Sequence, residues 1–148
     1  MQGLPSSVLF ACTMNSIRSP IAESILKFLH GHHIYVDSVG VHSSDINGFA
    51  VSVMDEIGID LSSHKGKRFD DLEDSFYDLV ISLSPEAQHR AVELTRTMAV
   101  EIEFWNTLDP SILIAETRED HLNAYREIRD ELMKKIKKRF PVGRASDT

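Results

Sequence analysis

The chain has 148 residues, 42% of them hydrophobic, and its 23 acidic and 16 basic side chains give a net charge of −7. This length and composition suit one globular domain, residues 1–148, that folds without disulfides. The negative charge argues against nonspecific nucleic-acid binding, and no apolar run approaches the ~20 residues of a membrane span. With a single cysteine and no secretory signal, we expect a cytoplasmic protein.

Short apolar runs alternate along the chain with longer amphipathic ones. The runs SSVLFAC, IYVDSVGV, YDLVISL and VEIEFW predict four strands, at residues 6–12, 34–41, 77–83 and 100–105. Because strands and helices alternate, we predict an α/β fold with a mainly parallel sheet. Such a sheet binds ligands beyond the carboxyl ends of its strands.

Four helices are predicted around the strands. The first has Ser19 as N-cap, Pro20 as its first residue and Gly31 as C-cap. Its expected apolar face comprises Ile21, Ile25, Phe28 and Leu29. The second carries Ala50, Val53, Met54 and Ile57 before a C-cap at Gly58. The third and fourth are expected at about 85–97 and 116–140, ahead of a frayed tail at about 142–148.

The segment CTMNSIR, residues 12–18, joins the first predicted strand to the first predicted helix. Backbone N–H groups of a curled loop and a helix N-terminus can hold a phosphate-sized dianion, and Arg18 can close that site with a bidentate fork. The same groups favour the thiolate of Cys12. Attack of this thiolate on phosphorus would give a phosphocysteine intermediate.

Asp109 and Pro110 follow the fourth predicted strand and so reach the same edge of the sheet. A protonated Asp109 could give its proton to a leaving oxygen and later take one from water, while Pro110 stiffens its approach. Each feature alone has a simpler interpretation, because Asp-Pro occurs in ordinary turns and a lone cysteine can be a core residue. Together they predict a phosphate site.

The residues from Cys12 to Pro20, followed at a distance by Asp109-Pro110, resemble the low-molecular-weight protein tyrosine phosphatase family, which includes thioredoxin-linked arsenate reductases. The similarity covers nearly the whole chain, since VDSVG, EIGIDLSSHKGKRF, YDLVISLS and AYREIRDEL occur in the family's order. The resemblance implies a single three-layer domain of flavodoxin-like topology, in which helices flank a four-stranded parallel sheet.

The resemblance also implies residue roles. Cys12 would be the nucleophile, Arg18 would bind phosphate and stabilise the transition state, and Asp109 would be acid and base. The phosphate-binding loop would comprise Thr13, Met14, Asn15, Ser16, Ile17 and Arg18. A supporting polar network would comprise Asn15, Ser19, Ser38 and His64, with Ser19 bonded to the Cys12 thiolate. From the sequence alone, His64 reads instead as a surface-loop histidine.

Two loop positions depart from the family pattern. Met14 stands where many relatives have glycine, and Ile17 stands where many phosphatases of the family carry a second cysteine. An adjacent disulfide therefore cannot protect Cys12. The cysteine relay of some arsenate reductases needs further cysteines, which this chain lacks.

The expected substrate wall also differs from the family. Phosphotyrosine-specific relatives hold the phenyl ring between aromatic side chains, but the corresponding regions here read HSSDINGF and DPSIL. Phe49, Phe69 or Trp105 could supply a wall, although each also fits the core.

Three functions remain open. The first is a cysteine-dependent phosphatase acting on phosphate monoesters, protein phosphotyrosine among them; the second is an arsenate reductase that uses an external thiol; the third is a noncatalytic phosphate-binding module. The expected partners are a phosphorylated protein or a small phosphate monoester, and neither nucleic acid nor membrane. No cofactor or metal is expected, because HGHH at 30–33 fits a helix end followed by a turn. The sequence does not indicate the oligomeric state.

Overall fold

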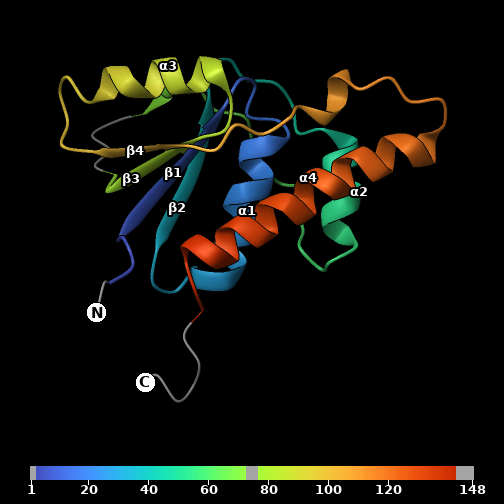
Figure 1. Ribbon diagram of the computed structural model, residues 1–148, viewed down its shortest axis with the longest axis horizontal. Helices are drawn as coiled ribbons and strands as arrows, with labels where there is room; N and C mark the ends of the chain where they lie inside the picture. The colour runs from blue at the N-terminus through green and yellow to red at the C-terminus, as the bar shows by residue number, and fades with distance from the viewer. Residues whose placement is uncertain (1–2, 73–76, 143–148) are drawn as a thin grey trace.

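Four parallel strands form the centre of the protein, in the spatial order β2-β1-β3-β4. The computed structural model describes residues 3–72 and 77–142 (Figure 1). The strands are β1 (Ser7–Cys12), β2 (Tyr35–Gly40), β3 (Leu79–Ser82) and β4 (Glu101–Phe104). Each lies within the range predicted for it from the sequence, because a run of apolar residues bounded by polar turns is typical of a strand buried in a parallel sheet.

Helices cover both faces of the sheet and complete a three-layer α/β domain (Figure 1). The α-helices are α1 (Arg18–His30), α2 (Gly48–Asp55), α3 (Pro85–Leu94) and α4 (Arg118–Arg139), and two short 3₁₀-helices are η1 (Phe69–Asp71) and η2 (Pro110–Ile112). In Figure 1, α3 lies on one side of the strands and α1 and α4 on the other, while α2 packs against α4. The predicted fold class is confirmed.

The central strand β1 is buried on both faces. Val8 and Phe10 belong to the cluster under α1 and α4, whereas Leu9 and Ala11 belong to the cluster under α3. Because successive side chains of a strand point to opposite faces, both sets must be apolar. This explains why β1 reads as an uninterrupted apolar run that leads straight to the loop after Cys12.

Two predictions for α1 are wrong. The helix begins at Arg18 with Ile17 as N-cap, so Ser19 lies inside the first turn, and its hydroxyl is used elsewhere. Phe28 is 66% exposed, although it shares a nominal face with Ile21. The buried stripe drifts around the helix because 3.6 residues make a turn, and Phe28 falls at its edge. The stripe contains Ile21, Ala22, Ile25 and Leu26.

The end of α4 is tied to the rest of the fold. His30, at the end of α1, makes a 2.8 Å hydrogen bond from Nε2 to the backbone oxygen of Phe140. Arg139 makes a 2.8 Å ion pair with Glu103 of β4. The predicted frayed tail lies outside the described residues from position 143 onward. In the part of the chain that the structure describes, no helix is both long and apolar enough to cross a membrane.

Candidate active site

The chain turns from β1 into α1 through residues 13–17. Asn15 has a left-handed backbone conformation, with φ of 54°, and is the only non-glycine residue of the described chain with a positive φ. Asparagine adopts this conformation more readily than most residues. Beside the bend, the backbone N–H of His42 donates to the oxygen of Thr13 at 2.8 Å. The loop is therefore bent at Asn15 and anchored to the segment that follows β2.

The fully buried side chain of Asn15 links the loop to its surroundings. Its Oδ1 accepts the backbone N–H of Lys67 at 2.9 Å, and since a backbone nitrogen can only donate, this bond fixes the orientation of the amide. Nδ2 then donates to the hydroxyls of Ser19 and Ser38, both at 2.9 Å. The residues of the predicted supporting network therefore lie together.

Two hydrogen-bond donors face the sulfur of Cys12, which is 2% exposed. The Ser19 hydroxyl lies 2.8 Å from Sγ, and the backbone N–H of Asn15 donates to Sγ at 3.3 Å. The Ser19 hydroxyl accepts from the Asn15 amide and has two acceptors within reach of its own proton, the sulfur at 2.8 Å and the Val39 backbone oxygen at 3.4 Å, of which the sulfur is the nearer. Donors arranged in this way stabilise a thiolate.

Glu23 completes the network and was missed by the sequence reasoning. Its Oε1 accepts the Ser38 hydroxyl at 2.5 Å and lies 3.7 Å from His64 Nδ1. His64 Nε2 lies 3.1 Å from Asn15 Oδ1, so it must donate there. Burial lowers the pKa of His64, and the nearby Glu23 carboxylate partly offsets this. Glu23 follows Ser19 by four residues on one helix, a spacing that places both on the same face.

Gly40, the last residue of β2, allows the loop to approach the sheet. A Cβ atom there would lie 2.7 Å from the Asn15 nitrogen and 2.9 Å from the Met14 carbonyl carbon. Any larger residue would push the bend of the loop outward. The sequence signal for this contact is a glycine at the end of a strand, because such a glycine often marks a place where another stretch of backbone packs closely against the strand.

Arg18 and Asp109 meet at the opposite side of the loop. Arg18 Nη1 donates to the backbone oxygen of Thr107 at 3.0 Å, and Nη2 lies 3.9 Å from Asp109 Oδ2. Asp109 Oδ1 accepts the backbone N–H of Ser111 at 2.9 Å and its hydroxyl at 2.7 Å. One carboxylate oxygen is thus held by the η2 turn, and the other faces the guanidinium.

A cavity of about 50 Å³ lies between these groups. It is lined by Cys12, Met14, Ser16, Ile17, Arg18, Asp109 and Ser111. The other predicted phosphate-loop residues have different contacts. Thr13 donates through Oγ1 to Ser84 Oγ at 3.0 Å, and Asn15 is buried beneath the loop. The chain therefore brings its thiol, one guanidinium and one carboxylate to a single small cavity.

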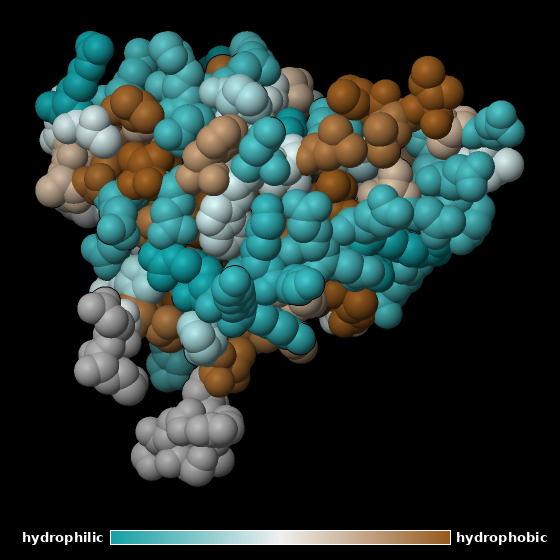
Figure 2. Space-filling view, in the orientation of Figure 1, coloured by the Kyte–Doolittle hydropathy of each residue, from teal (hydrophilic) through white to brown (hydrophobic). Residues whose placement is uncertain are grey.

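The three aromatic residues considered as a substrate wall are not among the residues lining the cavity. Phe69 is in the core, Phe49 stacks on His121, and Trp105 packs near Phe10. The exposed side chains closest in sequence to the lining residues are aliphatic. An apolar patch is formed by Ile112 at the end of η2 and by Leu113 and Ile114 directly after it, and Figure 2 shows this patch at the upper right.

The HGHH run contains a structural histidine, since His30 is buried and bonded to the end of α4. Within the described ranges, no three His, Cys, Asp or Glu side chains gather closely enough to hold a metal ion.

The whole arrangement, from β1 to the end of α4, matches one known family. Residues 7–141 fit the sequence profile described as "Low molecular weight phosphotyrosine protein phosphatase". This chain belongs to that family. The resemblance noted from the loop and Asp109 is therefore confirmed.

Relatives within the phosphatase family carry two kinds of name. The "Glutaredoxin arsenate reductase" of Synechocystis sp. is 40% identical over 76 residues, which is 51% of this chain and 58% of that protein. The "Arsenate reductase" of Bacillus subtilis is 30% identical over 93% of this chain and 96% of that protein. The solved low molecular weight protein tyrosine phosphatase from T. tengcongensis is 27% identical, with a TM-score of 0.67 over 89% of this chain and 95% of its own.

The family includes both phosphatases and arsenate reductases, so family membership alone does not distinguish these two activities, and the residues of the site must be considered. Cys12 is the only cysteine in the sequence. Ile17, where many family phosphatases carry a second thiol, lines the cavity with an aliphatic side chain. Any reaction that needs a second sulfur must therefore take it from another molecule.

Proposed function

We propose that the protein is a metal-independent cysteine phosphatase acting on phosphate monoesters, with Cys12, Arg18 and Asp109 as its catalytic residues. One observation carries the proposal: these three side chains border the same cavity of about 50 Å³. A cavity of this size takes a phosphoryl group and leaves the rest of the substrate outside. Membership of the phosphatase family supports the same function.

The first step forms a bond between Cys12 Sγ and phosphorus while the bond from phosphorus to the leaving oxygen breaks. Asp109, protonated at this stage, gives its proton to that oxygen. The available oxygen is Oδ2, because Oδ1 already accepts two hydrogen bonds from Ser111. Arg18 binds the nonbridging phosphoryl oxygens as their charge shifts in the transition state. The products are a free alcohol and a phosphocysteine.

The second step returns the enzyme to its starting state. Asp109, now a carboxylate, takes a proton from a water molecule whose oxygen attacks phosphorus. The bond between phosphorus and sulfur breaks, and inorganic phosphate leaves. The sulfur departs as a thiolate that the Ser19 hydroxyl and the Asn15 N–H stabilise. In this scheme Asn15, Ser19, Ser38 and His64 are positioning residues, and Thr13 to Ile17 contribute the backbone of the phosphate loop.

The test is hydrolysis of p-nitrophenyl phosphate in the presence of EDTA, followed by a panel of phosphotyrosine peptides, phosphoserine peptides and sugar phosphates. Cys12→Ser should abolish turnover while leaving the fold intact by circular dichroism. Undiminished hydrolysis by that variant would refute the mechanism. Tight vanadate binding without turnover on any substrate would favour the noncatalytic phosphate-binding module instead.

Arsenate reduction with an external thiol is the second candidate, and the names of the Synechocystis and Bacillus relatives favour it. Arsenate would condense with the Cys12 thiol and release water. An external thiol would then attack the Cys12 sulfur, so that the sulfur–arsenic bond breaks, arsenic(V) becomes arsenic(III) and a mixed disulfide forms. A second external thiol would reduce that disulfide and restore Cys12. Incubation with arsenate and glutathione, with and without glutaredoxin or thioredoxin, would test this through arsenite production above a protein-free control.

A further inference from the structure

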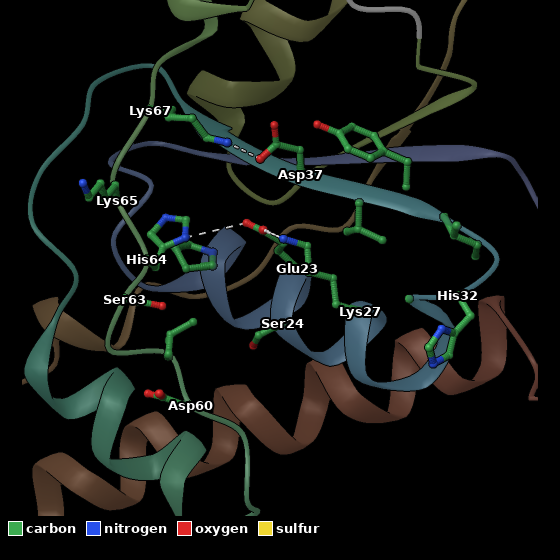
Figure 3. A pocket seen from close by; sticks show the side chains of 16 residues that line it. Glu23, Ser24, Lys27, His32, Asp37, Asp60, Ser63, His64, Lys65 and Lys67 are labelled. Atoms are coloured by element: carbon green, nitrogen blue, oxygen red, sulfur yellow. Dashed lines mark hydrogen bonds and ion pairs between the residues drawn. The ribbon is translucent and has the colours of Figure 1, made fainter.

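A large cleft lies away from the phosphate loop, between α1, β2 and the segment 60–67 (Figure 3). It has a volume of about 770 Å³ and shares no lining residue with the small cavity at Cys12. Ligand pockets in proteins commonly have volumes of about 300–1,000 Å³. The cleft is therefore large enough for a small organic molecule.

The carboxylates at this cleft already have partners within the chain. Glu23 pairs with Lys27 at 2.5 Å, and Asp37 pairs with Lys67. Asp60 accepts hydrogen bonds of 2.9 and 2.6 Å from the turn that follows it, and these bonds lower its pKa. Each of these three carboxylates therefore already has an ion pair or hydrogen bonds within the protein.

Lys27 and Lys67 are matched by these carboxylates, but one further lysine of the cleft is not. In the described part of the chain, Lys65 and His32 make no ion pair or side-chain hydrogen bond, and both line the cleft (Figure 3). Three lysines face three carboxylates there, with two histidines in addition, although the chain as a whole has a net charge of −7. These charges balance, and Lys65 is the lysine of the cleft that has no carboxylate partner in the described chain, so an incoming anion would meet Lys65 first. The apolar part of the wall is formed by Pro20, Ile34, Val36 and Leu61.

We propose that this cleft binds a small anionic molecule with an apolar body, such as an aryl or alkyl carboxylate, sulfonate or phosphate, and that its binding is coupled to the phosphate loop. The anionic group would lie among Lys27, Lys65 and Lys67, and the apolar body would pack on the wall. This is a second site, distinct from the one that holds the phosphoryl group in the proposed function.

A continuous set of hydrogen bonds joins the cleft to the phosphate loop. Glu23, which lines the cleft, accepts the Ser38 hydroxyl; Ser38 Oγ accepts from Asn15 Nδ2; and the Asn15 N–H donates to Cys12 Sγ. A bound anion would compete with Glu23 for the ammonium of Lys27. The Glu23 charge would then be less compensated, and together with the anion it would disfavour the Cys12 thiolate. Occupancy of the cleft should therefore slow reactions of Cys12.

Binding is tested by NMR titration of the ¹⁵N-labelled full chain with 1-naphthalenesulfonate, and with the uncharged 1-naphthalenemethanol as a matched probe. The sulfonate should shift amide signals of residues 23–36 and 60–67, and the alcohol should do so far less. Lys65→Glu should weaken sulfonate binding about fivefold, as expected for the loss and reversal of an exposed charge contact. Arg96→Glu makes the same change of charge after α3, on the other side of the sheet, and should leave the affinity unchanged.

Coupling is tested by the rate at which iodoacetamide alkylates Cys12, the only thiol of the chain. Saturating sulfonate should slow this rate at least twofold in the native protein. In Glu23→Gln, which loses one of the two charges that carry the effect, the sulfonate should slow the rate less than in the native protein. Neither readout depends on turnover, so the outcome is independent of whether the protein is a phosphatase.

Four results would overturn the proposal. The first is the absence of shifts at the cleft at millimolar sulfonate, and the second is equal binding of the alcohol. The third is equal weakening by Lys65→Glu and Arg96→Glu. The last is a set of shifts centred on residues 12–18, with slowing that persists in Lys65→Glu, because this would place the sulfonate in the small cavity at Cys12.

Discussion

The side-chain oxygen of Asn15 accepts the backbone N–H of Lys67 at 2.9 Å, and this bond determines which way the Asn15 side-chain amide points. It directs the Asn15 amide nitrogen toward Ser19 and Ser38, and the Ser19 hydroxyl in turn lies 2.8 Å from the Cys12 sulfur. The sulfur's surroundings therefore depend on a segment that follows it by more than fifty residues.

Replacing Asn15 separates its backbone role from its side-chain role. Asn15→Gly keeps access to positive φ but loses the amide, whereas Asn15→Ala loses both, because a left-handed conformation costs an ordinary residue about 1–2 kcal/mol. We expect both variants to be less stable to urea, and the alanine variant to be the less stable of the two. A free energy of unfolding for Asn15→Ala equal to that of the native chain would contradict this account.

Ser19→Ala should slow alkylation of Cys12 by iodoacetamide at pH 7 about tenfold or more. The hydroxyl is 2.8 Å from the sulfur, and a hydrogen bond to a charged group is worth about 1.5–3 kcal/mol. The matched control is Ser24→Ala on the same helix, since that hydroxyl donates to the Ile21 oxygen within the helix. If both substitutions changed the alkylation rate equally, the Ser19 bond would not be the cause.

Asp109→Asn should lower kcat about 10²- to 10⁴-fold for alkyl phosphates, which need a proton on the leaving oxygen. The loss should be smaller for p-nitrophenyl phosphate, whose leaving group needs less assistance. An asparagine can still accept the Ser111 hydrogen bonds, so the η2 turn should remain folded. Asp55→Asn, an exposed substitution on α2, serves as the control. Equal losses for good and poor leaving groups would argue against Asp109 as the acid.

Acidification should destabilise the protein through His64. Burial lowers the pKa of His64 from its ordinary 6.5, with Glu23 opposing and Lys67 reinforcing the effect. As pH falls through about 6.5, the unfolded chain gains a proton at this position while the folded chain does not, so stability decreases until the folded form is protonated as well. Urea unfolding between pH 5 and 7.5 should show this dependence reduced in His64→Gln. It should persist in His33→Gln, which removes an exposed histidine; an unchanged dependence in His64→Gln would show that other groups cause it.

The sequence was sufficient to predict the strands, because buried parallel strands leave apolar runs that few other structures produce. It was also sufficient to predict that Cys12, Arg18 and Asp109 meet, since each lies at or beyond the carboxyl end of a strand. The helix start at Arg18 was not predictable from capping preferences. Serine is a preferred N-cap residue, but the Ser19 hydroxyl contacts Cys12 and Asn15 of the loop and caps no helix.

The roles of Glu23 and Gly40, which support the phosphate loop from beneath, could not be predicted from the sequence. Glu23 looks like a surface helix residue, and Gly40 like an ordinary strand end. Their roles come from what packs against them: the Ser38 hydroxyl in one case and the backbone of the loop in the other. These partners are distant in sequence. The spacing of apolar residues within one helix or strand predicts which face is buried, but it does not predict which distant residue packs there.

The bond between His30 and the Phe140 carbonyl has a practical consequence. It fastens the end of α4 at the amino edge of the sheet, and Figure 1 shows this end on the far side from the loops that follow the strands. A sensor surface or a fluorophore attached at residues 141–142, which are exposed, would therefore face away from Cys12. Immobilisation by that end should leave the thiol open to ligands in flow-based measurements.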